Sequence, residues 1–211
     1  MRSKRNALTS YCKFLKISVD WERIKRLLPT EQRKLYSILT EEEFKKLLSV
    51  DTYTDKLTNE RNNLILEFLW YLGIRINELI NIRHCDYSDG WLRVKGKFNK
   101  YRSLLLPPFL VPYFDPFSKD YLFLTRHGKP LTKGQIRRNI NRKVKLAGIK
   151  KRISPHSFRR SLATNSYNLG IRLDTIQKQL GHTNLNTTIA YINNDYQSYY
   201  QDCSKYWVER I

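Results

Sequence analysis

The stretch LGHTNLNTTIAY, residues 180–191, joins a glycine, a histidine directly after it and a tyrosine nine positions further on. Glycine readily takes the left-handed conformation that closes many helices, so Gly181 is expected to end a helix capped by Asp174. His182 would then be fixed in the turn that follows. The segment NTTIAYI predicts a further helix, which would carry Tyr191. Solubility and packing do not require this combination, which therefore indicates a functional site.

The charge of the chain restricts its partners. The 211 residues, of which 41% are hydrophobic, suffice for a core, yet the net charge is +20. Such an excess indicates a polyanion, either nucleic acid or an anionic membrane surface. The longest nearly apolar run, LILEFLWYLGI from Leu64, is too short to span a bilayer and contains Glu67. No apolar signal region begins the chain. We therefore expect a soluble cytoplasmic protein without a membrane partner.

Redox, metal and nucleotide chemistry find little support in the sequence. The three cysteines (Cys12, Cys85 and Cys203) are odd in number and far apart, and the four histidines form no metal-ligand pair. Neither a phosphate-binding Walker loop nor an evident carboxylate cluster for two-metal catalysis is present. We predict no metal and no cofactor.

Positive charge is concentrated between Tyr121 and Leu173, where fourteen Lys and Arg residues occur without any Asp or Glu. Within this range, residues 132–148 predict a helix that Thr132 and Gln135 begin with a capping box and Gly148 ends. Its apolar stripe would pack on a core, and its other faces would follow phosphates. The stripe is Ile136, Ile140 and Val144, and the other faces carry Arg137, Arg138, Arg142, Lys143 and Lys145. A solvated basic face without a partner is the alternative.

The rest of the chain predicts a mainly α fold with a small antiparallel β-sheet (α+β). Residues 1–18 have the spacing of a short amphipathic helix, and a charged linker follows to about Leu39. A helix capped by Thr40 and a long apolar helix ended by Gly73 come next. The segment WLRVKGKFNKYRSLLLP then predicts two strands joined by a tight turn.

A phosphate site is predicted at the start of SPHSFRRSLATNSYNLG. Ser154 is expected to cap this helix and Pro155 to occupy its first position, which places His156 and Arg159 on the same face of the first turn. An imidazole and a guanidinium at a helix N-terminus suit a phosphate. Alternatively, His156 only assists the cap and Arg159 points to solvent.

Four segments, LGIRINEL, KGKFNKYR, HSFRRSLAT and LGHTNLNTTIAY, resemble in order and spacing the motifs of the tyrosine recombinase catalytic domain. This is the phage-integrase and Xer-type family, and the resemblance runs from about Leu39 to Tyr191. It implies the tyrosine recombinase catalytic-domain fold and a site-specific recombinase or integrase that cleaves and rejoins double-stranded DNA through a 3′-phosphotyrosyl intermediate. The implied catalytic residues are Arg75, Lys97, His156, Arg159, His182 and the nucleophile Tyr191.

The implied roles follow the chemistry of the phosphodiester. The arginines would stabilise charge on the non-bridging oxygens, and His182 would donate a hydrogen bond to the phosphate. His156 would accept the tyrosine proton, and Lys97 would protonate the departing 5′ oxygen. The residues expected to contact DNA are Lys133, Arg137, Arg138, Arg142, Lys145 and Arg160.

Two positions depart from the family pattern. Phe98 follows Lys97 where family members commonly have glycine, which leaves Lys100 as a rival for the general acid. Arg160 follows Arg159 where many members have histidine, and it would add a phosphate contact.

The resemblance also implies a domain organisation. Residues 1–38 would be a remnant helix of a core-binding domain plus a linker, in a fragment or a minimal natural form. Residues 39–191 would be the catalytic domain. Residues 192–211 form an aromatic stripe that docks either on its own core or on another protomer. We expect a monomer in isolation and a tetrameric synaptic complex on DNA.

The cellular setting implied is a prokaryote, or a virus or mobile element acting in its host cell. Two other functions remain open. One is a DNA-binding or architectural protein that keeps the fold without strand transfer, and the other is a nicking and closing enzyme similar to type IB topoisomerases.

Overall fold

The computed structural model describes residues 2–27, 37–96, 99, 101–182, 185–189 and 191–192. The chain divides into two compact units, residues 1–35 and residues 36–211. This division lies close to the boundary predicted at residue 38, and the assignment of both units to domains of the family remains a prediction. Apart from Ile192, the predicted C-terminal segment lies outside the described residues.

The first unit consists of helices α1 (Arg2–Phe14) and α2 (Trp21–Leu27). Helix α1 was expected, whereas the prediction of a linker directly after residue 18 is wrong for residues 21–27. The signal for α2 is Asp20, whose side-chain Oδ1 accepts the backbone N–H of Arg23 at 3.0 Å. A carboxylate in that position caps a helix N-terminus.

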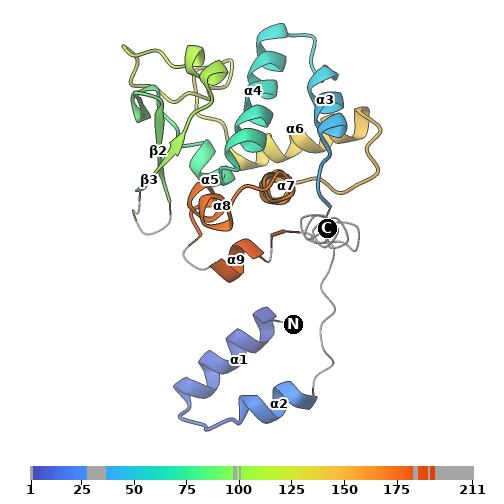
Figure 1. The fold of residues 1–211 in the computed structure, drawn as a ribbon, viewed down its shortest axis with the longest axis vertical. Coiled ribbons are helices and arrows are strands. Elements are labelled where there is room, and N and C mark those ends of the chain that lie inside the picture. The colour runs from blue at the N-terminus through green and yellow to red at the C-terminus, as the bar shows by residue number, and fades with distance from the viewer. Residues whose placement is uncertain are drawn as a thin grey trace, which may run out of the picture. The chain divides into compact units, whose positions relative to one another are not determined.

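The second unit combines helices with one small antiparallel sheet, as the sequence predicts (Figure 1). Its α-helices are α3 (Glu41–Ser49), α4 (Lys56–Leu72), α5 (Ile76–Leu79), α6 (Lys133–Leu146), α7 (Pro155–Asn168), α8 (Leu173–Leu180) and α9 (Leu185–Ile189). The 3-10 helices with described bounds are η1 (His84–Asp86) and η3 (Pro108–Tyr113), and the described strands are β1 (Tyr87–Ser88), β2 (Trp91–Lys95) and β3 (Tyr101–Leu105).

The predicted hairpin is present in antiparallel register, with Trp91 opposite Leu105 and Lys95 opposite Tyr101. The short strand β1 pairs with β2 on the other side, so the sheet has the order β1-β2-β3. Residues 97, 98 and 100 of the turn lie outside the described part of the chain.

Most of the predicted helix ends are confirmed. Thr40 and Thr132 each begin a helix with a capping box, and Gly73 and Gly181 end α4 and α8 in the left-handed conformation, with φ of 55° and 61°. A Cβ on Gly73 would also lie 2.6 Å from a Leu162 methyl carbon, so close packing requires glycine there as well.

Two local predictions are wrong. Arg172, and not Asp174, occupies the N-cap position of α8; Asp174 lies in the first turn and pairs with the Arg172 guanidinium at 3.1 Å. Tyr191 does not lie in a helix, because α9 ends at Ile189 and Tyr191 follows in a turn.

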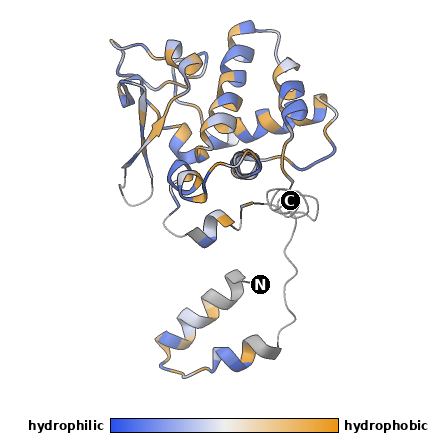
Figure 2. Ribbon diagram, in the orientation of Figure 1, coloured by the Kyte–Doolittle hydropathy of each residue, from blue (hydrophilic) through white to orange (hydrophobic). Residues whose placement is uncertain are grey.

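The core of the second unit lies around α4, which packs against α6 and α7. Hydrophobic and hydrophilic residues are mixed along these helices, as in amphipathic helices that surround a core (Figure 2). Phe44 stacks on Trp70 with ring centroids 4.5 Å apart and meets the buried Phe158 of α7 edge to face. The predicted stripe of α6, Ile136, Ile140 and Val144, is buried in this core. Among the described residues, no helix is both long and apolar enough to cross a bilayer.

Candidate active site

Arg75 lies three positions after the last residue of α4 and is the N-cap residue of the short helix α5. Its guanidinium donates to Glu78 Oε1 at 2.8 Å and to the backbone carbonyl of Gly181 at 3.3 Å. The side chain keeps 36% of its surface exposed, whereas that of Glu78 keeps 2%. Arg75 is therefore held in place from one side and remains accessible from the other.

Arg159 lies on α7 and is almost completely buried, with 1% of its surface exposed. One of its terminal nitrogens donates to the carbonyl of Gly73 at 2.6 Å and the other donates to the carbonyl of Leu180. Its Nε is buried without a hydrogen-bond partner in the described part of the chain. The alternative in which Arg159 points to solvent is therefore wrong.

The charge on Arg159 is costly in this setting. Burial, and after it the positive charges of Arg75 and Arg102, lower the pKa of Arg159 to about 10. The guanidinium remains protonated at neutral pH, but an anion placed beside it would relieve the repulsion.

His156 lies in the first turn of α7, after Pro155, as the sequence predicts. Desolvation and then the charges of Arg159, Arg160 and Arg75 lower its pKa below the ordinary value of 6.5. The imidazole is consequently neutral at pH 7 and able to accept a proton.

His182 follows the glycine that ends α8 and is buried, with 8% of its surface exposed. Its Nδ1 lies 2.9 Å from the Thr188 hydroxyl oxygen. Burial, and then Arg159, Arg75 and Arg102, lower the pKa of His182 to about 4. When the Thr188 hydroxyl donates to Nδ1, the proton of the neutral ring is on Nε2, which becomes a hydrogen-bond donor.

Tyr191 lies against the predicted catalytic residues. Its ring meets that of His182 at 63° with centroids 4.9 Å apart, and the Arg160 guanidinium carbon lies 4.7 Å from the ring centre. The corresponding distance from Arg159 is 5.9 Å. Four of the predicted catalytic residues, Arg75, Arg159, His182 and Tyr191, therefore surround one place, although the chain separates them by up to 116 positions.

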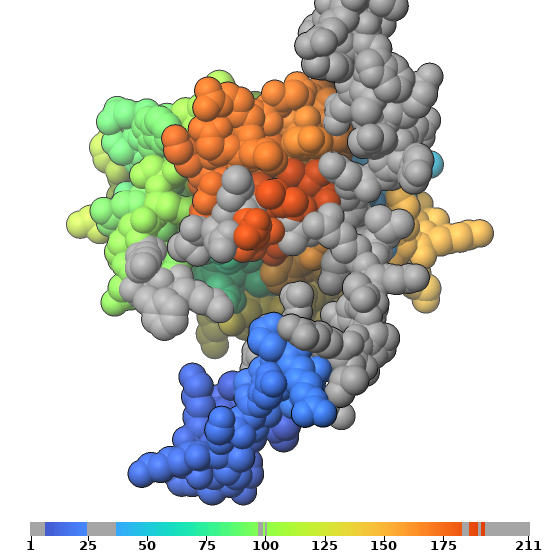
Figure 3. All heavy atoms as spheres, turned by 60° about the horizontal axis from the view of Figure 1, so that its bottom comes forward, coloured from blue at the N-terminus to red at the C-terminus, as the bar shows by residue number. Residues whose placement is uncertain are grey.

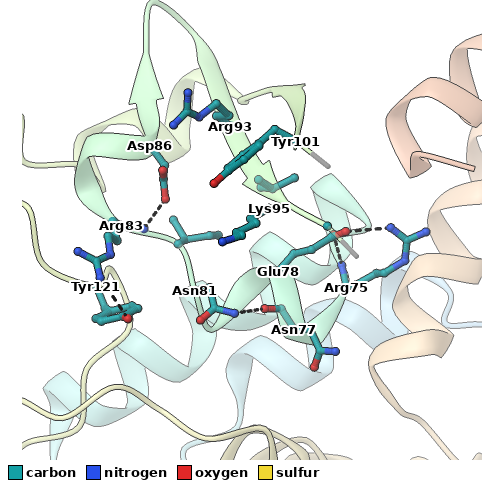
Figure 4. Close-up of a pocket in the computed structure, with 13 residues that line it drawn as sticks. Arg75, Asn77, Glu78, Asn81, Arg83, Asp86, Arg93, Lys95, Tyr101 and Tyr121 are labelled. Carbon is teal, nitrogen blue, oxygen red and sulfur yellow. Dashed lines mark hydrogen bonds and ion pairs between the residues drawn. The ribbon is translucent and has the colours of Figure 1, made fainter. Parts of the chain in front are cut away.

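The space-filling view shows α8 and α9, in orange and red, on one face with the green residues near the hairpin beside them (Figure 3). A hydrogen bond from Arg102 of β3 to the Leu180 carbonyl joins these parts of the chain. Next to this junction is a hollow of about 610 Å³, lined by Arg75, Glu78, Lys95 and Tyr101 among others. Figure 4 shows the Arg75–Glu78 pair on one side of it and the β2 and β3 side chains on the other.

The structure does not place all predicted site residues. Lys97 and its rival Lys100 lie outside the described residues, although Lys95, Gly96 and Tyr101, which flank them in sequence, line the hollow. The residues predicted to contact DNA from α6 are all exposed: Lys133, Arg137, Arg138, Arg142 and Lys145.

Lys143 was expected on an exposed face of α6, and this expectation is wrong. Its ammonium group is buried and donates to the carbonyls of Leu47 and Val50 and to Asn63 Oδ1, at 2.9, 2.5 and 2.6 Å. These three acceptors occupy all three donors of the ammonium group, so Lys143 is not available to a phosphate.

Two residues of the site, Glu78 and Arg102, were not predicted from the sequence. Glu78 had a local signal, because an acid three positions after Arg75 at a helix start is placed for a capping interaction. Arg102 ends the KGKFNKYR segment, but its contact with the Leu180 carbonyl could not be predicted, since only the folded hairpin brings β3 there. Across the described residues, no group of three or more His, Cys, Asp and Glu could hold a metal ion.

Comparison with known proteins agrees with this arrangement. Residues 37–198 match the model of the phage integrase family. A curated tyrosine recombinase of Thermosipho africanus is 34% identical over 89% of this chain and 69% of its own length. The chain belongs to the phage integrase family of tyrosine recombinases. The family predicted from the four motifs is thereby confirmed.

Other tyrosine recombinases are also similar to this chain in sequence or structure. The XerD recombinase of Staphylococcus haemolyticus is 34% identical over 77% of this chain and 60% of its own length. The crystal structure of a XerH site-specific recombinase, bound to its palindromic difH substrate after cleavage, matches with a TM-score of 0.68. It is 27% identical, and the match covers 81% of this chain and 53% of that one. The present chain thus spans between about half and two thirds of the length of these relatives.

Proposed function

We propose that this chain cleaves and rejoins DNA strands with Tyr191 as the nucleophile. The observation that carries the proposal is the meeting of Tyr191 with Arg159, His182 and Arg75 around one place. Tyr191 Oη would attack the scissile phosphorus as the bond to the 5′ oxygen breaks, which leaves a 3′-phosphotyrosyl linkage and a 5′ hydroxyl. The linkage conserves the bond energy for rejoining, so the step requires no external energy source.

The neighbouring groups fit the roles that this step requires. His156 is neutral and can accept the tyrosine proton. Arg75 is accessible to the non-bridging oxygens, and the buried charge of Arg159 adds to the field that stabilises the transition state. His182 can donate from Nε2. We assign protonation of the 5′ oxygen to Lys97 on the basis of its motif.

The partners follow from the charge and from the relatives. Double-stranded DNA would lie along the exposed basic side chains of α6, with Arg160 close to the reacting phosphate. Two protomers bound to DNA are known from a lambda integrase dimer on a core site. We propose that this chain is a monomer alone and forms a tetrameric synaptic complex on DNA. The protein would act in the cytoplasm of a prokaryotic cell. Its gene would belong to that cell, or to a virus or mobile element within it.

A covalent adduct tests the proposal. Incubation with nicked duplexes of randomised sequence, from which the cleaved end diffuses away, should trap the protein on DNA. Tyr191→Phe should abolish the adduct and leave DNA affinity almost unchanged, because it removes one hydroxyl and no charge. Tyr167→Phe, at a tyrosine packed in the same small apolar cluster, is the matched control and should retain the adduct.

Peptide mapping and product analysis separate the remaining functions. Attachment to a tyrosine other than Tyr191 would contradict the nucleophile assignment. Binding without an adduct would favour the architectural protein, and relaxation of supercoiled DNA without recombinant product would favour the nicking and closing enzyme. Sequencing of the attached DNA identifies the target.

A further inference from the structure

Arg102 is bound to both halves of the candidate site. It is the last residue of the KGKFNKYR segment, in which the resemblance gives a role only to the lysine. It is the second residue of β3, and 16% of its side chain is exposed. Nη2 donates to Glu78 Oε2 at 2.8 Å, and Nη1 donates to the carbonyl of Leu180. One guanidinium therefore connects the hairpin to α5 and to the end of α8.

We propose that Arg102 is a positioning residue for strand cleavage, which keeps Arg75 available to the scissile phosphate and fixes the turn that carries His182. The inference rests on the proposed function, because it names the group that prepares the same site. Arg102 would not contact the phosphate itself; it would act through Glu78 and Leu180.

Glu78 is a buried carboxylate that two arginines share, and it is 3% exposed. Oε1 accepts from the Arg75 guanidinium, while Oε2 accepts from the Arg75 backbone N–H at 2.9 Å and from Arg102. A buried carboxylate has to be paired. Without Arg102, the whole negative charge would fall to Arg75, which would bind the carboxylate in competition with the phosphate.

The end of α8 is held by three arginines. Arg102 and Arg159 both donate to the Leu180 carbonyl, and Arg75 donates to the carbonyl of Gly181. A Cβ on Gly181 would lie 2.2 Å from Arg102 Nη1, so the side chain of Arg102 packs directly over this glycine. Arg102 therefore constrains the backbone immediately before His182.

Positive charge is in excess around Glu78. Three guanidinium groups, those of Arg75, Arg102 and Arg159, gather around this single carboxylate. Arg102 Nε is buried and has no hydrogen-bond partner among the residues described. The excess charge is costly until an anion binds, and a phosphodiester is the anion that the proposed reaction supplies.

A double-mutant cycle tests this mechanism. Arg102→Met should lower the single-turnover cleavage rate about 10²-fold, the order expected for a small misplacement of reacting groups. Because part of its effect runs through Arg75, the same substitution should cost less in an Arg75→Ala background, where only its effect on the His182 turn remains. Equal losses in both backgrounds would overturn the proposal, because a general structural defect slows both enzymes alike.

Two further variants control for charge and folding. Lys45→Met removes one positive charge from an exposed ion pair with Glu41 and should cleave at the unmutated rate. Arg102→Lys keeps the charge and can reach Glu78, but a single ammonium cannot reproduce the two-sided fork. It should recover part of the lost rate and is the variant to use if Arg102→Met does not fold.

Inorganic phosphate provides a readout that does not depend on cleavage. At constant ionic strength, phosphate should raise the melting temperature of the unmutated chain and of Lys45→Met more than that of Arg102→Met. Equal shifts in all three proteins would overturn the inference even if strand cleavage is demonstrated. An unmutated chain that forms no adduct but shows this difference would contradict the proposed function alone.

Discussion

At the scale of single residues, His182 shows how the site controls protonation. The same arginines that would attract a phosphate lower the pKa of this imidazole to about 4, with burial as the larger cause. A neutral ring can donate one hydrogen bond while it accepts another from Thr188. The site thus combines a strong positive field with histidines that do not add to it.

The depressed pKa predicts a pH-dependent stability. Between pH 6.5 and about 4 the unfolded chain binds a proton at His182 that the folded chain does not bind, so the free energy of unfolding falls as pH falls. The contribution is complete above pH 6.5 and decreases by up to about 1.4 kcal/mol per pH unit below it. His182→Gln should reduce this slope in denaturant titrations.

His127 provides the control, because its side chain is exposed. His182→Gln should reduce the slope more than His127→Gln does. His156, whose pKa is also lowered, contributes a slope of the same sign, so some dependence should persist in His182→Gln. An identical slope in both glutamine variants would contradict the prediction.

At the scale of elements, the sequence predicted those features that local chemistry determines. The capping boxes at Thr40 and Thr132, the left-handed ends at Gly73 and Gly181 and the hairpin β2–β3 depend on neighbouring residues, and all are confirmed. Features that depend on distant residues were missed. Lys143 is buried because Leu47, Val50 and Asn63 supply acceptors from α3 and α4, and nothing within α6 indicates this.

The same distinction applies to the site. The motifs named Arg75, His156, Arg159, His182 and Tyr191, and the fold brings Arg75, Arg159, His182 and Tyr191 around one place. The sequence could not predict that the Arg159 donors are used by backbone carbonyls, because those carbonyls become available only where α4 and α8 end beside α7.

Helix α6 carries both a lysine with a structural role, Lys143, and an arginine predicted to bind DNA, Arg138. Lys143→Ala leaves one buried and two partly buried acceptors without their donor and should lower the free energy of unfolding by about 3 kcal/mol. Arg138→Ala, at an exposed position of the same helix, should leave the melting temperature unchanged. It should instead reduce the slope of log affinity for DNA against log salt by up to about one. A salt slope unaffected by Arg138→Ala would place this residue away from DNA.

A substrate with sulfur at the 5′ bridging position should identify the general acid carried by the hairpin. A general acid is required because an alkoxide leaves poorly, whereas a thiolate leaves without protonation. Lys97→Ala should therefore cleave the ordinary substrate about 10²–10⁴-fold more slowly, and a substrate with sulfur at the 5′ bridging position at nearly the unmutated rate. Arg75→Ala should show no rescue. If sulfur rescues Lys100→Ala and not Lys97→Ala, the acid is Lys100.

At the scale of the whole molecule, stability and charge are distributed differently over the two units. All hydrophobic clusters of the described residues lie between Leu39 and Ile192, within the second unit. The first unit does contribute charge, with ten Lys and Arg against three Asp and Glu in residues 1–35. The first unit should thus matter for binding DNA more than for folding.

A shortened chain of residues 36–211 tests this separation. Because the hydrophobic clusters of the described residues lie outside the deleted segment, its melting temperature should stay within a few degrees of that of the full chain. Its affinity for DNA should be lower, and the slope of log affinity against log salt should be smaller by about 0.9 for each phosphate that the shortened chain no longer binds.

Full-length proteins in which Lys4, Arg5 and Lys13 are replaced by Gln should show the same change in slope without any deletion. An unaltered slope in both would show that the first unit does not bind the phosphates, and loss of cooperative unfolding in the shortened chain would show that the core depends on it.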